Sequence, residues 1–180
     1  MRIRNFRSGD MLALALIQQA SAAVDQSTPM TTDDFFSWLL DPACDSDDNV
    51  FVMTDDDDEL LTWGQGGTLE GIEGEIIGYT VLRCDQDASG YHLLCQGAVH
   101  PEQRRRHAGL ALLGGALNRA RLIAAEFEFE AELAGISCYF EARLPISDEA
   151  SRYLAEKYTL AAVQHNVIDG MQLYQGELYS

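Results

Sequence analysis

Three consecutive arginines, Arg104, Arg105 and Arg106, precede the longest helical pattern of the chain. Cations at a helix N-terminus oppose the helix dipole, which costs roughly 0.3 to 1 kcal/mol each when they are exposed. A bound anion would favour them there, because free backbone N–H groups, the positive end of the dipole and the guanidinium donors would all point at it. A strand, a short turn, a loop containing Gly109 and a helix start form an arrangement that binds pyrophosphate. The segment therefore predicts a phosphate-binding loop.

The alternative is that these arginines pair with carboxylates at the protein surface. Glu102 is a near candidate in the sequence, but one ion pair accounts for one arginine and not for three. We therefore favour anion binding.

The segment Val99–Leu113 reads Val-His-Pro-Glu-Gln-Arg-Arg-Arg-His-Ala-Gly-Leu-Ala-Leu-Leu. It resembles the acetyl-coenzyme A signature of the GNAT superfamily of N-acetyltransferases, which runs Val-x-Pro-x-x-Arg-Gly-x-Gly-x-Gly-x-x-Leu-Leu. The resemblance implies an acyl-CoA co-substrate whose pyrophosphate lies on the loop and whose pantetheine arm bonds to the preceding strand. The fourth and fifth strands of this family splay apart, which leaves backbone groups that an extended ligand with amide groups can satisfy. The implied cofactor-binding residues are Gly97, Ala98, Val99, Arg104, Arg105, Arg106, His107, Ala108, Gly109 and Leu110.

The loop departs from the family pattern at a glycine position. With the strand and its proline as the anchor, His107 replaces a glycine of the loop, and its side chain either obstructs a phosphate or donates to one. In a second register, Arg106, Gly109 and Ala111 meet the pattern Arg-x-x-Gly-x-Ala. We prefer the first register, because it keeps the strand, the proline and the helix in place.

The second departure concerns catalysis. The segment Asp148–Lys157 is similar to the family's Asn-Glu-x-Ala-x-x-Leu-Tyr-Glu-Lys, but Ala155 stands where many members have the tyrosine that protonates the leaving thiolate. Tyr153 and Tyr158 are possible substitute acids, although ordinary half-buried packing also explains them. Glu141, on a strand that faces the cleft in this fold, is the candidate general base, acting directly or through water. A surface carboxylate is its simpler interpretation.

The resemblance thus implies an N-acetyltransferase that moves an acetyl group from acetyl-CoA, or from another acyl-CoA, to a primary amine of a small molecule or peptide by direct attack. A catalytically silent acyl-CoA-binding domain with a regulatory or structural role is the alternative, because of Ala155 and His107. A phosphate-binding module unrelated to coenzyme A is the third possibility. Acceptor contacts would come from residues 11–40, 55–74 and the last hairpin. Homodimers are frequent in this family, so a homodimer is a further expectation.

Composition narrows the class of partner. The 29 acidic and 12 basic residues give a formal charge of −17, which argues against nucleic acid and anionic membranes as partners. This charge suits a cationic substrate, although it also serves solubility.

The cysteines form no CxxC pair, which is typical of buried thiols in a reducing compartment. The histidines lack zinc-site spacing, so we expect no metal. No secretory h-region follows the N-terminus and no run approaches about 18 apolar residues, so we expect a cytoplasmic protein.

The order of strand and helix patterns along the chain predicts one α+β domain over residues 1–180. A chain of this length can bury a sizeable hydrophobic core. Alternation and turn residues predict strands near residues 2–7, 49–54, 75–83, 91–99, 137–143, 160–167 and 171–178. Capping residues and apolar spacing predict helices at residues 11–24, 31–40, from about 105, and 148–158. The order implies a mixed, mostly antiparallel sheet of six or seven strands flanked by about four helices. Residues 55–74 form a long acidic and glycine-rich connection, read as a solvated hairpin or flexible loop or as part of an active site.

Overall fold

The computed structural model describes residues 1–55 and 74–179. The strands are β1 (Arg2–Asn5), β2 (Val50–Thr54), β3 (Ile76–Asp87), β4 (Gly90–Val99), β5 (Ser137–Pro145), β6 (Ala161–Ile168) and β7 (Met171–Tyr179). The helices are α1 (Met11–Asp25), α2 (Thr32–Leu39), α3 (Ser46–Asn49), α4 (Ala108–Ala134) and α5 (Glu149–Lys157). Short 3-10 turns lie at Ser8–Asp10, Pro42–Cys44 and Pro101–Gln103. The predicted helices correspond to α1, α2, α4 and α5, and α3 adds a single turn.

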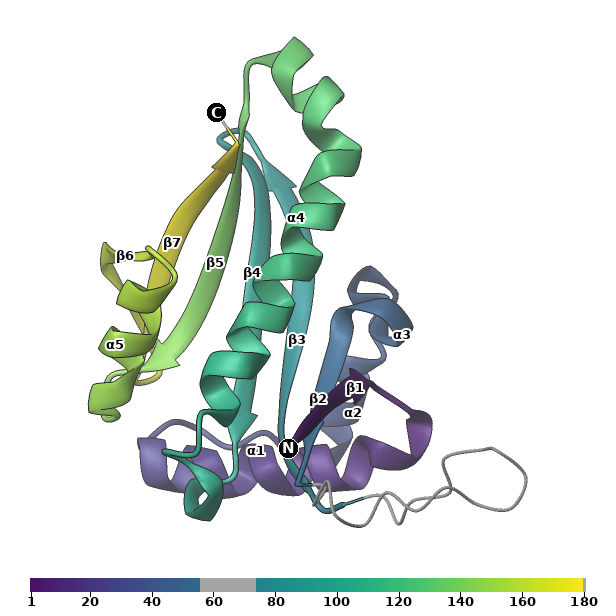
Figure 1. Cartoon of the computed structure of the whole chain (residues 1–180), viewed down its shortest axis with the longest axis vertical. Coiled ribbons are helices and arrows are strands. Elements are labelled where there is room, and N and C mark those ends of the chain that lie inside the picture. Colours follow the sequence, from purple (N-terminus) through teal and green to yellow (C-terminus); the bar gives the residue numbers. More distant parts are fainter. Residues whose placement is uncertain (56–73, 180) are drawn as a thin grey trace.

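The described strands form one sheet in the order β1-β2-β3-β4-β5-β7-β6 (Figure 1). Every neighbouring pair is antiparallel except β4 and β5, which are parallel. A parallel pair needs a crossover, and α4 supplies it. The expectation of a mixed α+β fold with a mostly antiparallel sheet of six or seven strands is confirmed.

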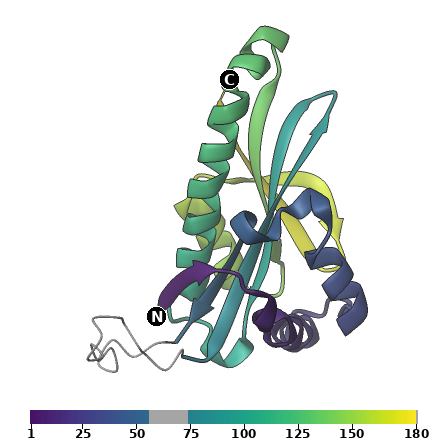
Figure 2. The same cartoon turned by 90° about the vertical axis from the view of Figure 1, so that its right-hand side faces the viewer.

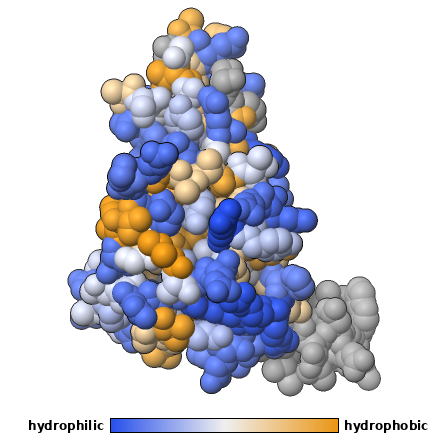
Figure 3. Space-filling model, turned by 90° about the vertical axis from the view of Figure 1, so that its left-hand side faces the viewer, coloured by the Kyte–Doolittle hydropathy of each residue, from blue (hydrophilic) through white to orange (hydrophobic). Residues whose placement is uncertain are grey.

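Helices cover both faces of the sheet (Figure 2). Helices α4 and α5 pack on one face, over a core that includes Leu93, Phe140 and Ala155. Helices α1 and α2 pack on the other, over a core that includes Phe35 and Val81. Hydrophilic side chains cover most of the face that carries α5 and β6, as the strongly acidic composition requires (Figure 3). No helix in residues 1–55 and 74–179 is both long and apolar enough to span a membrane.

Helix α4 begins three residues later than the sequence predicts. Arg105 and His107 have φ angles of 66° and 64°, a left-handed conformation that cannot continue into a helix, so the first helical residue is Ala108. The expected apolar face is buried at Leu113 and at the positions that follow it every three or four residues. The helix ends at Gly135, whose φ of 64° provides a left-handed C-cap.

The strand β3 is longer than the sequence predicts, because its last four residues carry polar or small side chains that give no β signal. A two-residue turn of Ala88 and Ser89 joins it to β4, so the two strands form a hairpin. Of the acidic and glycine-rich connection, only Asp55 and Gly74 belong to the described residues, and the predictions made for residues 56–73 lie outside them.

Candidate functional site

The strands β4 and β5 separate at one end of the sheet. Their pairing runs from Gly90 and Ser137 to Cys95 and Ala142 and then stops. Beyond that point β4 continues along β3 through residues 96–99, and β5 continues along β7 through residues 143–145. The splay that the resemblance implies is therefore present, and it opens a wedge-shaped gap in the sheet.

The edge of β4 that borders the gap carries unpaired backbone groups. The N–H of His100 donates to the carbonyl of Ile77 in β3 at 2.8 Å. Successive peptide groups of a strand point to opposite sides, so those of Val99 and Gly97 point away from β3 and toward the gap. The carbonyl of Val99 accepts from Ser21 and from Arg104, and the N–H groups of Gly97 and Val99 remain available to a ligand.

Two cavities meet at this gap, one on each face of the sheet. The α4-side cavity has a volume of about 330 Å³ and is lined by Gly109, Leu113, Leu154 and other mostly apolar residues. The α1-side cavity has a volume of about 310 Å³ and lies against α1, α2 and the turn between β6 and β7. The residues that line both cavities are Asp25, Tyr79, Gly97, Ala98, Arg143 and Met171. An extended ligand on the α4 side would therefore have its end within reach of a second ligand on the α1 side.

The loop before α4 presents a row of free backbone donors at the mouth of the α4-side cavity. Among the described residues, the N–H groups of residues 105–110 have no hydrogen-bond partner. The left-handed positions, Arg105 and His107, both coincide with glycines of the signature in its first register. The sequence alone singled out only His107. Free N–H groups at the start of a long helix, alternating with left-handed residues, suit an anion.

The three arginines of the loop have carboxylate partners, which corrects the argument that they need a bound anion. Arg104 forms a bidentate pair with Asp25, with both N···O distances at 2.7 Å. Arg105 bonds to Asp148 at 2.9 Å. Arg106 bonds to Asp55 at 2.9 and 3.2 Å. Each partner comes from a distant part of the chain, so inspection of nearby residues such as Glu102 could not reveal them.

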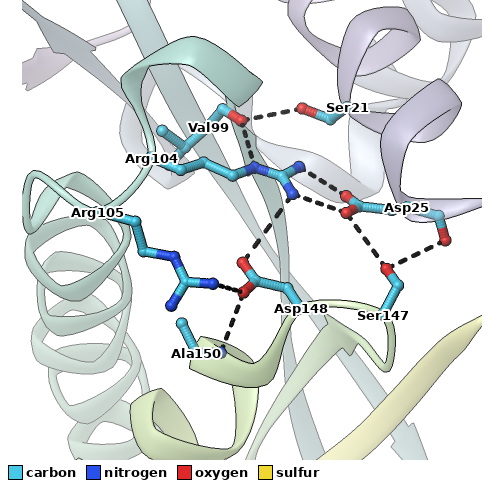
Figure 4. A network of polar contacts seen from close by, with 8 residues as sticks. All are labelled: Ser21, Asp25, Val99, Arg104, Arg105, Ser147, Asp148 and Ala150. Carbon is cyan, nitrogen blue, oxygen red and sulfur yellow. Dashed lines mark hydrogen bonds and ion pairs between the residues drawn. The ribbon is translucent and has the colours of Figure 1, made fainter.

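Arg104 lies at the centre of a network that ties three elements together (Figure 4). Its guanidinium reaches Asp25 at the end of α1 and lies 4.0 Å from Asp148, the N-cap of α5. Its Nε also donates to the carbonyl of Val99. The hydrogen bond to Asp25 outweighs partial burial, so the pKa of Arg104 is raised. Arg104 therefore holds α1, the loop and the start of α5 in place around the gap.

The candidate catalytic residues do not come together. Tyr153 lines the α4-side cavity and is largely exposed, while Ala155 is fully buried against α4. Tyr158 donates to the carbonyl of Leu110 at 2.8 Å and lines neither cavity. Glu141 also lies outside both cavities. Its Oε1 atom bonds to His92 and Gln175, each at 2.9 Å.

Comparison with known proteins rests on structure, because no protein-family model and no curated protein sequence matches the chain. The chain is similar to a GNAT superfamily phosphinothricin acetyltransferase from Sinorhizobium meliloti in complex with acetyl-CoA, with 15% identity, a TM-score of 0.62 and coverage of 99% of this chain and 88% of that one. It is also similar to the ribosomal-protein-S18-alanine N-acetyltransferase from Escherichia coli, with 15% identity, a TM-score of 0.59 and coverage of 99% and 94%. A NatC complex bound to Gag peptide and CoA matches with 11% identity, a TM-score of 0.59 and coverage of 99% and 98%. The chain therefore has the fold of the GNAT superfamily.

Proposed function

We propose that the protein is an N-acetyltransferase that transfers an acetyl group from acetyl-CoA to a primary amine of a small molecule or peptide. The observation that carries the proposal is the gap between β4 and β5, which joins two cavities and ends at a row of free N–H groups. The solved structures with the same fold include acetyltransferases bound to acetyl-CoA or CoA, which supports the choice of co-substrate. The fold alone would not support it, because one fold hosts many activities.

In this proposal the residues divide by position along the α4-side cavity. The N–H groups of residues 105–110 hold the pyrophosphate, and the edge of β4 at Gly97, Ala98 and Val99 holds the pantetheine arm. The side chains of Arg104, Arg105 and Arg106 shape the loop through their carboxylate partners, and we expect their remaining N–H donors to bond to the phosphates. His107 and Gly109 border the cavity where the loop becomes helix.

The chemistry requires a neutral amine, a polarised thioester carbonyl and a proton for the departing sulfur. A backbone N–H of Gly97 or Val99 is positioned to donate to the carbonyl oxygen, on which negative charge develops. The amine nitrogen bonds to the carbonyl carbon, the carbon–sulfur bond breaks, and the proton lost by the amine ends on the thiolate. Tyr153 is the acid candidate that borders the α4-side cavity. Glu141 lies outside both cavities, so any proton transfer to it has to pass through water.

A catalytically silent acyl-CoA-binding domain remains the second candidate. Ala155 is fully buried at the position where many members of the GNAT superfamily have a tyrosine, so that position offers no general acid. Turnover separates the two candidates. An N-acetyltransferase releases free thiol from acetyl-CoA in the presence of a suitable amine, and a silent acyl-CoA-binding domain does not.

The variant Gly109→Leu tests the cofactor cavity directly. A Cβ at Gly109 has only the Val99 side chain nearby, at 3.9 Å, so leucine fits the protein but enters the α4-side cavity. We expect acetyl-CoA affinity to fall at least about 10-fold while stability holds or rises, because glycine is a poor helix former. The control Ala111→Leu adds a leucine to the exposed face of the same helix and should leave affinity unchanged. Unchanged affinity in Gly109→Leu, or no binding by the parent protein, would refute the proposed site.

A further inference from the structure

One half-buried arginine in the described part of the chain has no acceptor. The arginines that have a side-chain acceptor there include Arg4, Arg83, Arg104, Arg105, Arg106, Arg119 and Arg152. Arg143 has none among the residues that the structure describes, although acidic residues outnumber basic ones by 29 to 12 in the full sequence. Arg143 is partly exposed, and a guanidinium without a protein partner is available to an anionic group of a ligand.

Arg143 lies where the proposed reaction would take place. It is the first residue of β5 beyond the pairing with β4, and it lines both cavities. Its neighbours Phe140 and Ala142 belong to the core beneath α4. Because strand residues alternate, Arg143 and Glu141 belong to the opposite face, the one covered by α1 and α2. The side chain of Arg143 therefore reaches the gap from the α1 side of the sheet, where the amine that receives the acetyl group would bind.

The carboxylates in the α1-side cavity are occupied by other groups. Asp25 is held by both guanidinium nitrogens of Arg104. Asp169 accepts from the backbone N–H and the hydroxyl of Thr28, at 2.7 and 2.9 Å. Glu141, on the same face of β5, is bonded to His92 and Gln175. None of these pairs with Arg143 among the described residues, so the cation is left for a bound molecule.

One wall of the α1-side cavity is apolar and aromatic, and polar side chains such as Gln18, Ser21 and Gln96 line other parts of it. Its apolar wall consists of Met30, Phe35, Trp38, Tyr79, Ile168 and Met171. Phe35 packs against Trp38 and Tyr79 with ring centroids 5.6 and 5.7 Å apart, which fixes that side of the wall. Complete burial raises the pKa of Tyr79, so its phenol stays neutral and adds no charge. Among the described residues that line it, the cavity thus offers one unpaired cation, Arg143, beside an apolar wall.

We propose that the acceptor is an α-amino acid with an apolar side chain, whose carboxylate pairs with Arg143. This inference rests on the proposed acetyl transfer at the same gap. Because Arg143 lies at the gap itself, an acid group bonded to it must be close to the attacking nitrogen, as an α-carboxylate is. Guanidinium binds carboxylate through two parallel hydrogen bonds, which also orients the amine. The apolar side chain of the acceptor then lies against Phe35 and Trp38.

Binding measured without turnover tests the inference. Standard amino acids, with leucine, methionine and phenylalanine foremost, are titrated into protein with and without saturating CoA, next to the amines formed by removing their carboxylates. We expect at least one amino acid to bind about 10-fold or more tightly than its amine. Arg143→Met should erase that preference, while its affinity for acetyl-CoA changes less than about twofold. The control Arg121→Met removes an exposed arginine of α4 and should keep the preference.

The outcomes separate this inference from the proposed function. Equal affinity for an amino acid and its amine, a preference that survives Arg143→Met, or no binding by any amino acid overturns the inference. A loss of acetyl-CoA affinity in Arg143→Met also overturns it, because Arg143 would then serve the co-substrate. Failure of acetyl-CoA to bind the parent protein, or absence of thiol release with every amine, counts against the proposed function alone.

Discussion

Arg104 and Asp25 form a bidentate ion pair that joins the phosphate-binding loop to the end of α1. Both N···O distances are 2.7 Å, and the side chains are only 17% and 8% exposed. Removing one partner of such a pair leaves the other charge unpaired in a poorly hydrated place. The pair therefore stabilises the arrangement around the gap, and we expect the losses of unfolding free energy on removing either partner to be non-additive.

A double-mutant cycle of Arg104→Ala and Asp25→Ala measures that coupling. We expect each single variant to lose about 2 to 4 kcal/mol of unfolding free energy, and the double variant to lose about 2 kcal/mol less than the sum. Denaturant unfolding of the four proteins checks it. The exposed pair Arg152 and Glu156 serves as the control cycle and should show no measurable coupling. Additive losses in the first cycle would mean that the pair only contributes packing.

His107 carries a left-handed backbone where the signature has glycine, and its side chain borders the α4-side cavity. His107→Ala removes the imidazole but keeps the strain, whereas His107→Gly removes both. We expect the glycine variant to be more stable than the alanine variant by about 1 kcal/mol. Thermal unfolding measures this difference, and equal stability would contradict the assigned conformation.

The same two variants decide what the imidazole of His107 does. Acetyl-CoA affinity that rises in both variants means that the side chain obstructs the phosphates. Affinity that falls in both means that it donates to them. Calorimetric titration distinguishes the two, because the change in strain is confined to the glycine variant.

Local features were the part of this protein that its sequence could predict. The helices and strands, α4 among them, depend on nearby residues and on turn chemistry, and the predicted ones are found as expected apart from their ends. The partners of the arginines lie 79, 43 and 51 residues away, so no local pattern shows them. Arg143 likewise gives no signal, because its isolation depends on where β5 parts from β4.

Gly97 is a position where only glycine fits. A Cβ there would lie 2.3 Å from the carbonyl oxygen of Tyr79 and 2.8 Å from the Cα of Thr80, both in the backbone of β3. Gly97→Ala must push β3 and β4 apart next to the gap, so we expect a loss of at least about 2 kcal/mol of unfolding free energy. Urea unfolding measures it. Gly9→Ala is the matched control, because nothing lies within 4 Å of its added Cβ.

His92 links β4 to β5 and to the end of β3, and its charge makes stability depend on pH. Its Nδ1 lies 2.9 Å from Glu141, and its Nε2 lies 3.3 Å from Asp87. Burial lowers the pKa of His92, but the hydrogen bond and charge of Glu141, with Asp87, outweigh it and raise the pKa. Asp87, whose pKa is lowered to about 2 chiefly by Ser89, stays ionised near neutral pH.

A histidine with a raised folded pKa binds its proton more tightly in the folded state. Its contribution to stability is therefore complete below the unfolded pKa, near 6.5, and is lost as pH rises through the folded pKa. We expect the unfolding free energy to fall with rising pH from about 6 upward, and His92→Gln to flatten this part of the curve. Urea unfolding at closely spaced pH values provides the measurement. Glu141→Gln should flatten it as well, since it removes the principal acceptor, and an unaltered slope in both variants would show that another group governs it.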